Sequence, residues 1–95
     1  MPIVSFKDRL AEGILQGRMP GKGFPADLVR VAKRKLLMLN NARRLDDLRF
    51  PPGNRLEALR GDRQGQHAIR LNDQFRLRFV WTDGGPADVE IVDYH

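Results

Sequence analysis

The sequence predicts an α+β fold in which two helices pack against one face of an antiparallel β-sheet. The first half of the chain, up to about residue 40, has apolar residues at helical spacing. The second half, from residue 55 onward, has short runs in which apolar and polar residues alternate, separated by residues that favour turns. With a short apolar run at the start, the predicted order of elements is β-α-α-β-β-β-β.

The N-terminal segment is expected to form an edge strand followed by a short helix. Residues 2–4 are apolar, and Pro2 cannot donate a hydrogen bond to a neighbouring strand. Ser5, with Asp8 three residues later, is predicted to be the N-cap of the first helix. One face of this helix repeats every four residues, at Phe6, Leu10 and Ile14.

The second helix is predicted over residues 25–40, because a proline suits the first turn of a helix and Asp27 lies near its positive end. Its apolar stripe consists of Leu28, Val31, Ala32, Leu36 and Leu39. Its other faces carry Arg30, Lys33, Arg34 and Lys35. These cations form either a solvated helix surface or a supplementary phosphate-binding flank, and the sequence leaves both interpretations open.

Four strands are predicted in the second half of the chain, over residues 55–60, 66–71, 75–81 and 87–94. Turns are expected over residues 61–65, at Asn72-Asp73 and over residues 82–86. The third strand alternates, with Phe75, Leu77, Phe79 and Trp81 on one face and Arg76, Arg78 and Val80 on the other. The sheet is therefore predicted to have an apolar face toward the helices and a cationic face away from them.

Length and composition limit the classes of protein to consider. Ninety-five residues predict one domain, residues 1–95. A net charge of +5 favours nucleic acid or an acidic protein as the partner. The absence of cysteine excludes disulfides, thiolate zinc sites and a cysteine nucleophile. No apolar run approaches the ~20 residues of a membrane helix, and no signal peptide is recognisable, so the cytoplasm is the expected compartment.

The two histidines do not indicate a metal site. Neither His67 nor His95 has a second histidine at ligand spacing, so no metal or other cofactor is expected. His67 shares its strand face with Ile69 and Leu71, and we interpret it as a packing residue.

The arginines of the predicted sheet favour a phosphate-bearing partner. Six arginines and no lysine lie between Arg55 and Arg78. Cleavage of RNA without a metal requires a base for the 2′-hydroxyl, cations for the phosphorane and an acid for the leaving oxygen. The candidates are Glu57 as the base, Arg60, Arg76 and Arg78 as the cations, and His95 as the acid, with Tyr94 orienting a group or stacking on a nucleobase.

Each candidate also has a purely structural interpretation. Glu57 can pair with Arg55 or with an arginine of the adjacent strand, as surface carboxylates commonly do with little effect on stability. Arg76 and Arg78 can belong to a solvated sheet face. His95 is the last residue of the sequence, where side chains are commonly frayed.

Three stretches of the sequence resemble the HigB-type toxins of the RelE/ParE superfamily, also called plasmid maintenance killer proteins. They are RKLLMLNNARRLDDLR, PPGNRLEALRGDRQGQHAIRLNDQFRLRFVW and the closing VEIVDYH, so the resemblance covers nearly the whole chain. The combination of R-L-x-x-L-x-G-D-R-x-G, N-D-Q-[FW]-R and a terminal D-Y-H is specific. The resemblance implies a compact RelE-like fold and a ribosome-dependent endoribonuclease that cuts mRNA in the decoding site. It also implies inhibition by a HigA-like antitoxin with a helix-turn-helix domain.

Carried over residue by residue, the resemblance assigns functional roles to Arg60, Arg76, Asp93, Tyr94 and His95. Further contacts to RNA are expected from Arg55, Arg63, Arg78, Lys33 and Arg34. Some HigB proteins have histidine where this chain has Glu57, whereas YoeB-like members have glutamate there as the general base. The sequence therefore leaves open whether Glu57 or Asp93 is the base.

This assignment of site residues raises a question about the geometry of the first predicted strand of the sheet. Glu57 and Arg60 would face opposite sides of a regular strand, so both reach one site only if the strand bends or ends near Leu59.

Two functions other than mRNA cleavage also stay open. One is a toxin of the gyrase-poisoning type, which acts on a protein without catalysis. The other is an RNA- or ribosome-binding module whose charges give only salt-dependent affinity.

Overall fold

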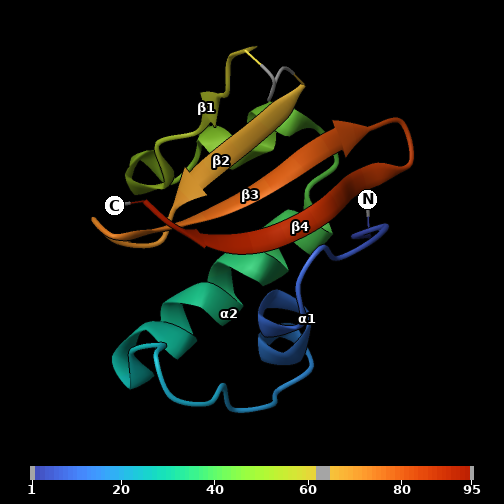
Figure 1. Ribbon diagram of the computed structural model, residues 1–95. Helices are drawn as coiled ribbons and strands as arrows, with labels where there is room; N and C mark the ends of the chain where they lie inside the picture. Colours follow the sequence, from blue (N-terminus) through green and yellow to red (C-terminus); the bar gives the residue numbers. More distant parts are fainter. Residues whose placement is uncertain (1, 62–64, 95) are drawn as a thin grey trace.

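The computed structural model describes residues 2–61 and 65–94 and has a helical layer on one face of a four-stranded sheet (Figure 1). The helices are α1 (Arg9–Leu15) and α2 (Ala26–Asn41), followed by the short 3₁₀ helices η1 (Leu45–Arg49) and η2 (Pro52–Asn54). The strands are β1 (Glu57–Ala58), β2 (Gln66–Arg70), β3 (Phe75–Thr82) and β4 (Gly85–Asp93). They lie in the order β1-β2-β3-β4, each antiparallel to its neighbour, which confirms the predicted α+β architecture. In the part of the chain that the structure describes, no helix is long and apolar enough to cross a membrane.

The two-faced pattern of β3 is confirmed. Phe75, Leu77 and Phe79 are buried in the core, where they join the apolar side chains of the helices and of the other strands. Burying each such side chain contributes about 1.5–3 kcal/mol relative to leaving it exposed. Arg76 and Arg78 alternate with them and lie on the face away from the helices. We call this face, which carries the side chains of β1–β4 that point away from the core, the outer face.

The predicted N-terminal strand over residues 2–4 is wrong. Residues 2–4 form no strand, although Val4 N donates to the carbonyl oxygen of Pro86 in β4 at 2.7 Å. An isolated parallel bridge follows just beyond them, between Phe6 and Val89. Lys7 N also donates to the carbonyl oxygen of Val89 at 2.9 Å. Regular pairing does not develop because the neighbouring Asp88 has a positive φ of 51°, which interrupts the pleat of β4 at this point.

Asp8, rather than Ser5, caps α1. Its Oδ1 accepts a hydrogen bond from Ala11 N at 2.9 Å, and its Oδ2 accepts one from Ile91 N of β4 at 3.0 Å. Ser5 Oγ instead accepts from Asp88 N at 2.9 Å. One carboxylate therefore both begins the helix and attaches it to the sheet. The helix starts later than predicted because the preceding residues are held in an extended conformation along β4.

α2 closely matches the predicted helix, but its solvated face was predicted incorrectly at Lys35. The side chain of Lys35 is buried, and its Nζ donates to the backbone carbonyl oxygen of Arg70 at the end of β2. Desolvation lowers the pKa of Lys35 from its ordinary value of 10.5, and the charges of Arg34 and Arg70 lower it further. A cation predicted to face solvent thus attaches α2 to the sheet.

β1 is much shorter than the strand predicted over residues 55–60. Arg55 follows η2 in the left-handed region of backbone conformation, with a φ of 48°, which a regular strand cannot include. The strand itself consists of Glu57–Ala58, and beyond it Leu59 N still donates to the carbonyl oxygen of Gln66 at 2.9 Å. The strand ends before Leu59, so Glu57 and Arg60 are not constrained to opposite faces.

A largely buried ion pair joins β3 to β4 on the outer face. Arg78 lies opposite Glu90, and its Nε and Nη2 donate to Glu90 Oε2 at 3.1 and 3.0 Å. The two side chains are only 13% and 14% exposed, and Lys7 Nζ lies 3.6 Å from the same oxygen. Removing Arg78 leaves the poorly solvated Glu90 with the longer contact to the exposed Lys7 as its remaining ion pair.

We therefore expect Arg78→Ala to lower the free energy of unfolding by about 3 kcal/mol, as measured by urea denaturation. The double variant Arg78→Met, Glu90→Leu removes both charges and is expected to recover most of this loss. The control is Arg49→Ala, which breaks the exposed Arg49–Asp46 pair and should cost less than about 1 kcal/mol. Equal losses for Arg78→Ala and Arg49→Ala would contradict this assignment.

Lys35 predicts a specific dependence of stability on pH. Because its pKa is lower in the folded protein than in the unfolded chain, the unfolded chain binds more protons in the interval between the two values. The free energy of unfolding therefore rises with pH in that interval. We expect the difference between wild type and Lys35→Met to shift in favour of wild type as the pH rises toward 10.5. A difference that does not vary with pH in urea titrations would show that Lys35 has an ordinary pKa.

Candidate functional site

Two rows of side chains cross the outer face. In one row Arg70 of β2 lies directly opposite Arg76 of β3. In the next row Ala68 lies between Glu57 of β1 and Arg78 of β3. Directly opposed residues of antiparallel strands have their Cβ atoms about 5 Å apart. The register therefore sets two guanidinium side chains next to each other at the end of the β2–β3 hairpin, one row away from a carboxylate.

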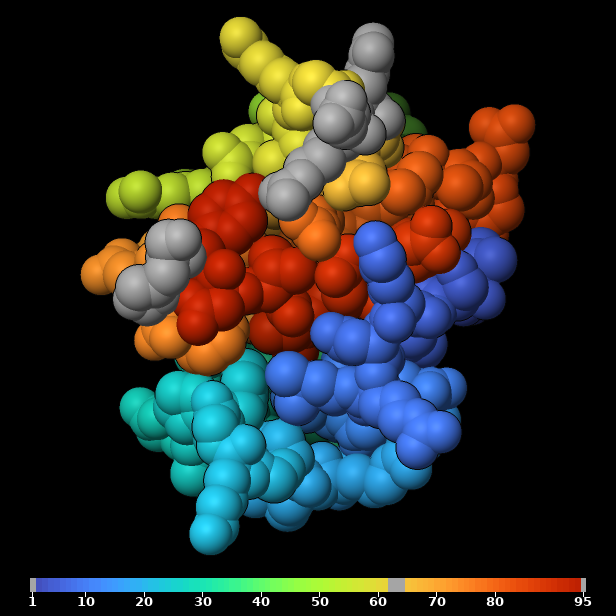
Figure 2. Space-filling view, viewed as in Figure 1, coloured from blue at the N-terminus to red at the C-terminus, as the bar shows by residue number. Residues whose placement is uncertain are grey.

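Arginine side chains surround the turn between β2 and β3. Arg70 Nη2 donates to Asp73 Oδ1, and this hydrogen bond together with the charge of Arg70 lowers the pKa of Asp73. The charges of Arg55 and Arg76 lower that pKa further. In Figure 2 this turn (orange), the end of β4 (red) and the chain before β1 (yellow-green) adjoin on one side of the molecule. An anion is stabilised by such a convergence of cations.

Arg76 is held in place by contacts that use only part of the hydrogen-bonding capacity of its guanidinium group. Its Nη1 donates to the backbone carbonyl oxygen of Asn72 and, at 3.1 Å, to that of Phe75. The central carbon of the group lies 5.3 Å from the centroid of the Tyr94 ring, a cation–π contact. Nε and Nη2 have no hydrogen-bond partner within residues 2–61 and 65–94. These nitrogens can donate to two phosphate oxygens at once.

The other two arginines of β2 and β3 on the outer face have carboxylate partners. Arg70 pairs with Asp73, and Arg78 pairs with Glu90. Arg78 is one of the residues expected to contact RNA, and the structure gives it a partner within the sheet. Its contact with RNA stays a prediction.

Glu57 shares the outer face with Arg76. Its cross-strand neighbour Ala68 is small and fully buried, and the side chain of Glu57 itself is exposed. Among the described residues Glu57 has no ion pair or hydrogen bond to its carboxylate, so the alternative pairing with Arg55 is not observed. Arg60 is exposed just beyond β1.

Asp93 and Tyr94 lie at the end of β4 beside the β2–β3 turn, as Figure 1 shows for these segments. Asp93 is paired with Phe75, whose side chain is in the core, so its register places it on the face opposite to Arg76. Its Oδ2 accepts a hydrogen bond from Gln74 Nε2 at 3.0 Å. Tyr94 N donates to the carbonyl oxygen of Gln74 at 2.6 Å, and its ring is on the outer face.

The remaining predicted site residues are elsewhere. His95, the candidate acid, and Arg63 lie outside the described residues. Lys33 and Arg34 are exposed on α2, in the helical layer behind the sheet, so the structure does not bring them onto the outer face.

Three residues of this arrangement were not predicted to belong to the site: Arg70, Asn72 and Gln74. The pairing of Arg70 with Arg76 was readable, because strands over residues 66–71 and 75–81 that are folded symmetrically about the turn bring these two residues opposite each other. The hydrogen bonds of Asn72 and Gln74 had no comparable signal, because they depend on the exact path of the turn.

His67 is a packing residue, as predicted. Its ring stacks on Phe79, with centroids 6.2 Å apart and planes inclined by 20°. Burial lowers the pKa of His67, and the charge of Arg49 lowers it further, whereas a backbone hydrogen bond at Gly65 opposes this shift. The neutral ring is therefore favoured.

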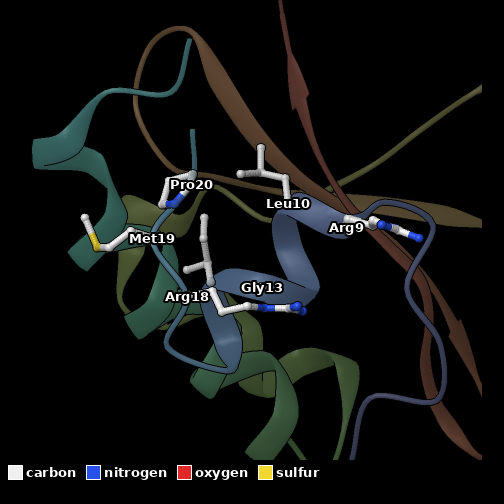
Figure 3. Close-up of a pocket in the computed structure, with 7 residues that line it drawn as sticks. Arg9, Leu10, Gly13, Arg18, Met19 and Pro20 are labelled. Atoms are coloured by element: carbon white, nitrogen blue, oxygen red, sulfur yellow. The ribbon is translucent and has the colours of Figure 1, made fainter. Parts of the chain in front are cut away.

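A small cavity of about 170 Å³ lies on the helical side of the molecule, between α1 and the loop that follows it (Figure 3). Its lining includes Arg9, Leu10, Gly13, Arg18, Met19 and Pro20. None of the predicted site residues contributes to it. The groups suited to phosphate chemistry are on the outer face instead.

Comparison with known proteins identifies the family of this chain. A family model described as the RelE-like toxin of the type II toxin-antitoxin system HigB matches residues 4–95. The chain is 40% identical over 81 residues to "Toxin HigB-1" of Vibrio cholerae, and the match covers 85% of each chain. It is also 40% identical over 59 residues to an uncharacterized protein of Haemophilus influenzae, covering 62% of this chain and 58% of that protein. The chain therefore belongs to the HigB-like family, the RelE-like toxins of type II toxin–antitoxin systems.

Proposed function

We propose that this toxin is a ribosome-dependent mRNA endonuclease whose active site is the outer face beside the β2–β3 turn. The observation that carries the proposal is the state of Arg76. Two backbone carbonyls orient its guanidinium group and the Tyr94 ring supports it, while Nε and Nη2 have no partner among the described residues. The resemblance to HigB endonucleases indicates the substrate, which is mRNA in the decoding site of the ribosome.

The proposed reaction is attack by the ribose 2′-oxygen on the adjacent phosphorus. Glu57 accepts the proton of the 2′-hydroxyl, and Arg76 stabilises the negative charge of the phosphorane, with Arg55 and Arg70 adding to the field. The bond from phosphorus to the 5′-oxygen breaks, and His95 donates a proton to that oxygen. The products are a 2′,3′-cyclic phosphate and a 5′-hydroxyl, and both proton transfers are made by side chains without a metal.

Register supports Glu57 rather than Asp93 as the base. Glu57 is on the same face as Arg76 and Tyr94, and its carboxylate is exposed. Asp93 is on the opposite face by register, and its carboxylate already accepts a hydrogen bond from Gln74. We therefore assign Asp93 a role in holding the site together.

The proposed partners follow from the same assignment. They are the ribosome with its mRNA, and a HigA-like antitoxin with a helix-turn-helix domain, all in the cytoplasm. Arg55 and Arg60 are exposed beside the outer face and are proposed to contact the RNA backbone. Such contacts predict an affinity that falls as the salt concentration rises.

Arg76→Ala is expected to slow single-turnover cleavage of ribosome-bound mRNA by about 10²–10³-fold, because the phosphorane loses its oriented donors. The control is Arg30→Ala, which removes the same charge from the exposed face of α2 and should leave the rate unchanged. Cleavage is measured by mapping mRNA 5′ ends. Equal cleavage rates for Arg76→Ala and wild type would contradict the proposal.

The same preparations test the two alternative functions. Binding to ribosomes without any cleavage by wild type would favour the RNA-binding module. Inhibition of DNA supercoiling would favour the gyrase-type toxin.

The identity of the base is tested by two conservative substitutions. Glu57→Gln removes a base from the outer face and is expected to slow cleavage by about 10²–10⁴-fold. Asp93→Asn retains an acceptor for Gln74 and is expected to stay within about 10-fold of wild type, since one neutral acceptor replaces a charged one at a cost of about 1 kcal/mol. The reverse order of effects, measured in the same assay, would make Asp93 the base.

A further inference from the structure

A set of hydrogen bonds centred on the β2–β3 turn reaches both the guanidinium of Arg76 and the end of β4. Asn72 Oδ1 accepts from Gln74 N at 2.9 Å and from Phe75 N at 2.7 Å. The backbone carbonyl oxygen of the same residue accepts from Arg76 Nη1. Asn72 therefore fixes the backbone at Gln74 and the orientation of Arg76 together.

Gln74 extends this set to the neighbouring chain segment. Its side-chain Nε2 donates to Asp93 Oδ2 at 3.0 Å, and its backbone carbonyl accepts from Tyr94 N at 2.6 Å. Tyr94 in turn lies against the guanidinium of Arg76. The contacts form a closed circuit from the turn to the end of β4 and back to the turn.

We propose that Gln74 is a positioning residue that seats the end of β4 so that Tyr94 stays against Arg76. The catalytic consequence of this seating rests on the function proposed above, whereas the seating itself does not. The carboxamide holds the carboxylate of Asp93 by a charge-assisted hydrogen bond, and the adjacent backbone bond then sets the direction in which the Tyr94 ring leaves the strand.

The chemistry of an amide at position 74 is specific. Alanine there would keep the backbone hydrogen bond to Tyr94 but would remove the hydrogen bond that the carboxamide donates to Asp93. Glutamate has the same shape as glutamine, but it would place a second carboxylate about 3 Å from Asp93, where like charges repel. Gln74→Glu should therefore be more harmful than Gln74→Ala if the contact to Asp93 is the one that matters.

The test uses the fact that Tyr94 is the only tyrosine in the sequence. The full-length toxin is labelled with 3-fluorotyrosine, and its single fluorine NMR resonance reports the environment of the Tyr94 ring. We expect Gln74→Ala and Gln74→Glu to move this resonance toward the value found in the unfolded chain, in the same direction as Arg76→Ala. The control is Gln16→Ala, which removes an exposed amide that bonds Arg18 on the helical side and should leave the resonance unmoved.

The same variants are then compared in single-turnover cleavage at saturating ribosome concentration. A misplaced site group commonly costs up to about 10²-fold, so Gln74→Ala is expected to slow cleavage by roughly 10–100-fold without changing the ribosome concentration that gives half-maximal rate. The double variant Gln74→Glu, Asp93→Asn reverses donor and acceptor in the same pair. We expect it to restore the resonance and most of the rate lost in Gln74→Glu.

The two measurements separate the possible failures. A slower rate in Gln74→Ala with the resonance at its wild-type position would mean that Gln74 touches the substrate directly, and it would overturn the positioning role. A displaced resonance with an unchanged rate would overturn it as well. If wild type cleaves no mRNA, the proposed nuclease function fails, and the resonance alone decides whether Gln74 seats Tyr94.

Discussion

The antiparallel register of the β2–β3 hairpin is the constraint on which the site depends. It places Arg70 directly opposite Arg76, and like charges in such a pair are destabilising when nothing compensates them. The turn supplies two compensating groups, the carboxylate of Asp73 and the backbone carbonyl of Asn72. A bound phosphate would add further compensation. The fold therefore holds cationic side chains close together, and a bound anion would reduce the repulsion between them.

Two arginines of the same strand have different roles because their cross-strand neighbours differ. Arg78 lies opposite Glu90 and forms a largely buried ion pair with it, so its charge is engaged in a contact between β3 and β4. Arg76 lies opposite Val92, which offers no acceptor, and its guanidinium turns instead to the carbonyls of the turn and to the ring of Tyr94. The availability of Arg76 for a ligand thus follows from one apolar residue on β4.

Alternation and spacing were sufficient to predict the four-stranded sheet and the second helix. The grouping of Arg76 with Tyr94 came instead from the chemistry of RNA cleavage and from the resemblance to HigB-type toxins. Alternation and spacing failed where backbone conformation departs from a regular element. The left-handed conformation of Arg55 shortens β1, and the positive φ of Asp88 prevents a regular N-terminal strand. Arginine seldom adopts a positive φ, and aspartate adopts one too rarely for a single residue to predict it. Lys35 was placed in solvent because a lysine is seldom buried, yet a free carbonyl at the end of β2 gives it a partner.

The same distinction applies to the candidate site, where residue types could be predicted and the hydrogen bonds between them could not. The charges and the aromatic ring are visible in the sequence as residue types on several predicted strands. The hydrogen bonds that orient them, from Asn72 and Gln74, arise from the course of a short turn and from its contact with a segment far along the chain. Which carboxylate faces the arginines also depended on register, which favours Glu57 over Asp93.

The most direct test of the location of the site is photo-crosslinking on the ribosome. An mRNA with a 2′-deoxynucleotide at the cleaved position lacks the attacking hydroxyl, and a photoreactive base beside it would report which toxin residues lie against it. The account predicts crosslinks to the β2–β3 turn and the end of β4, around Arg76 and Tyr94. Crosslinks confined to α1, α2 or the cavity beside Met19 would contradict it.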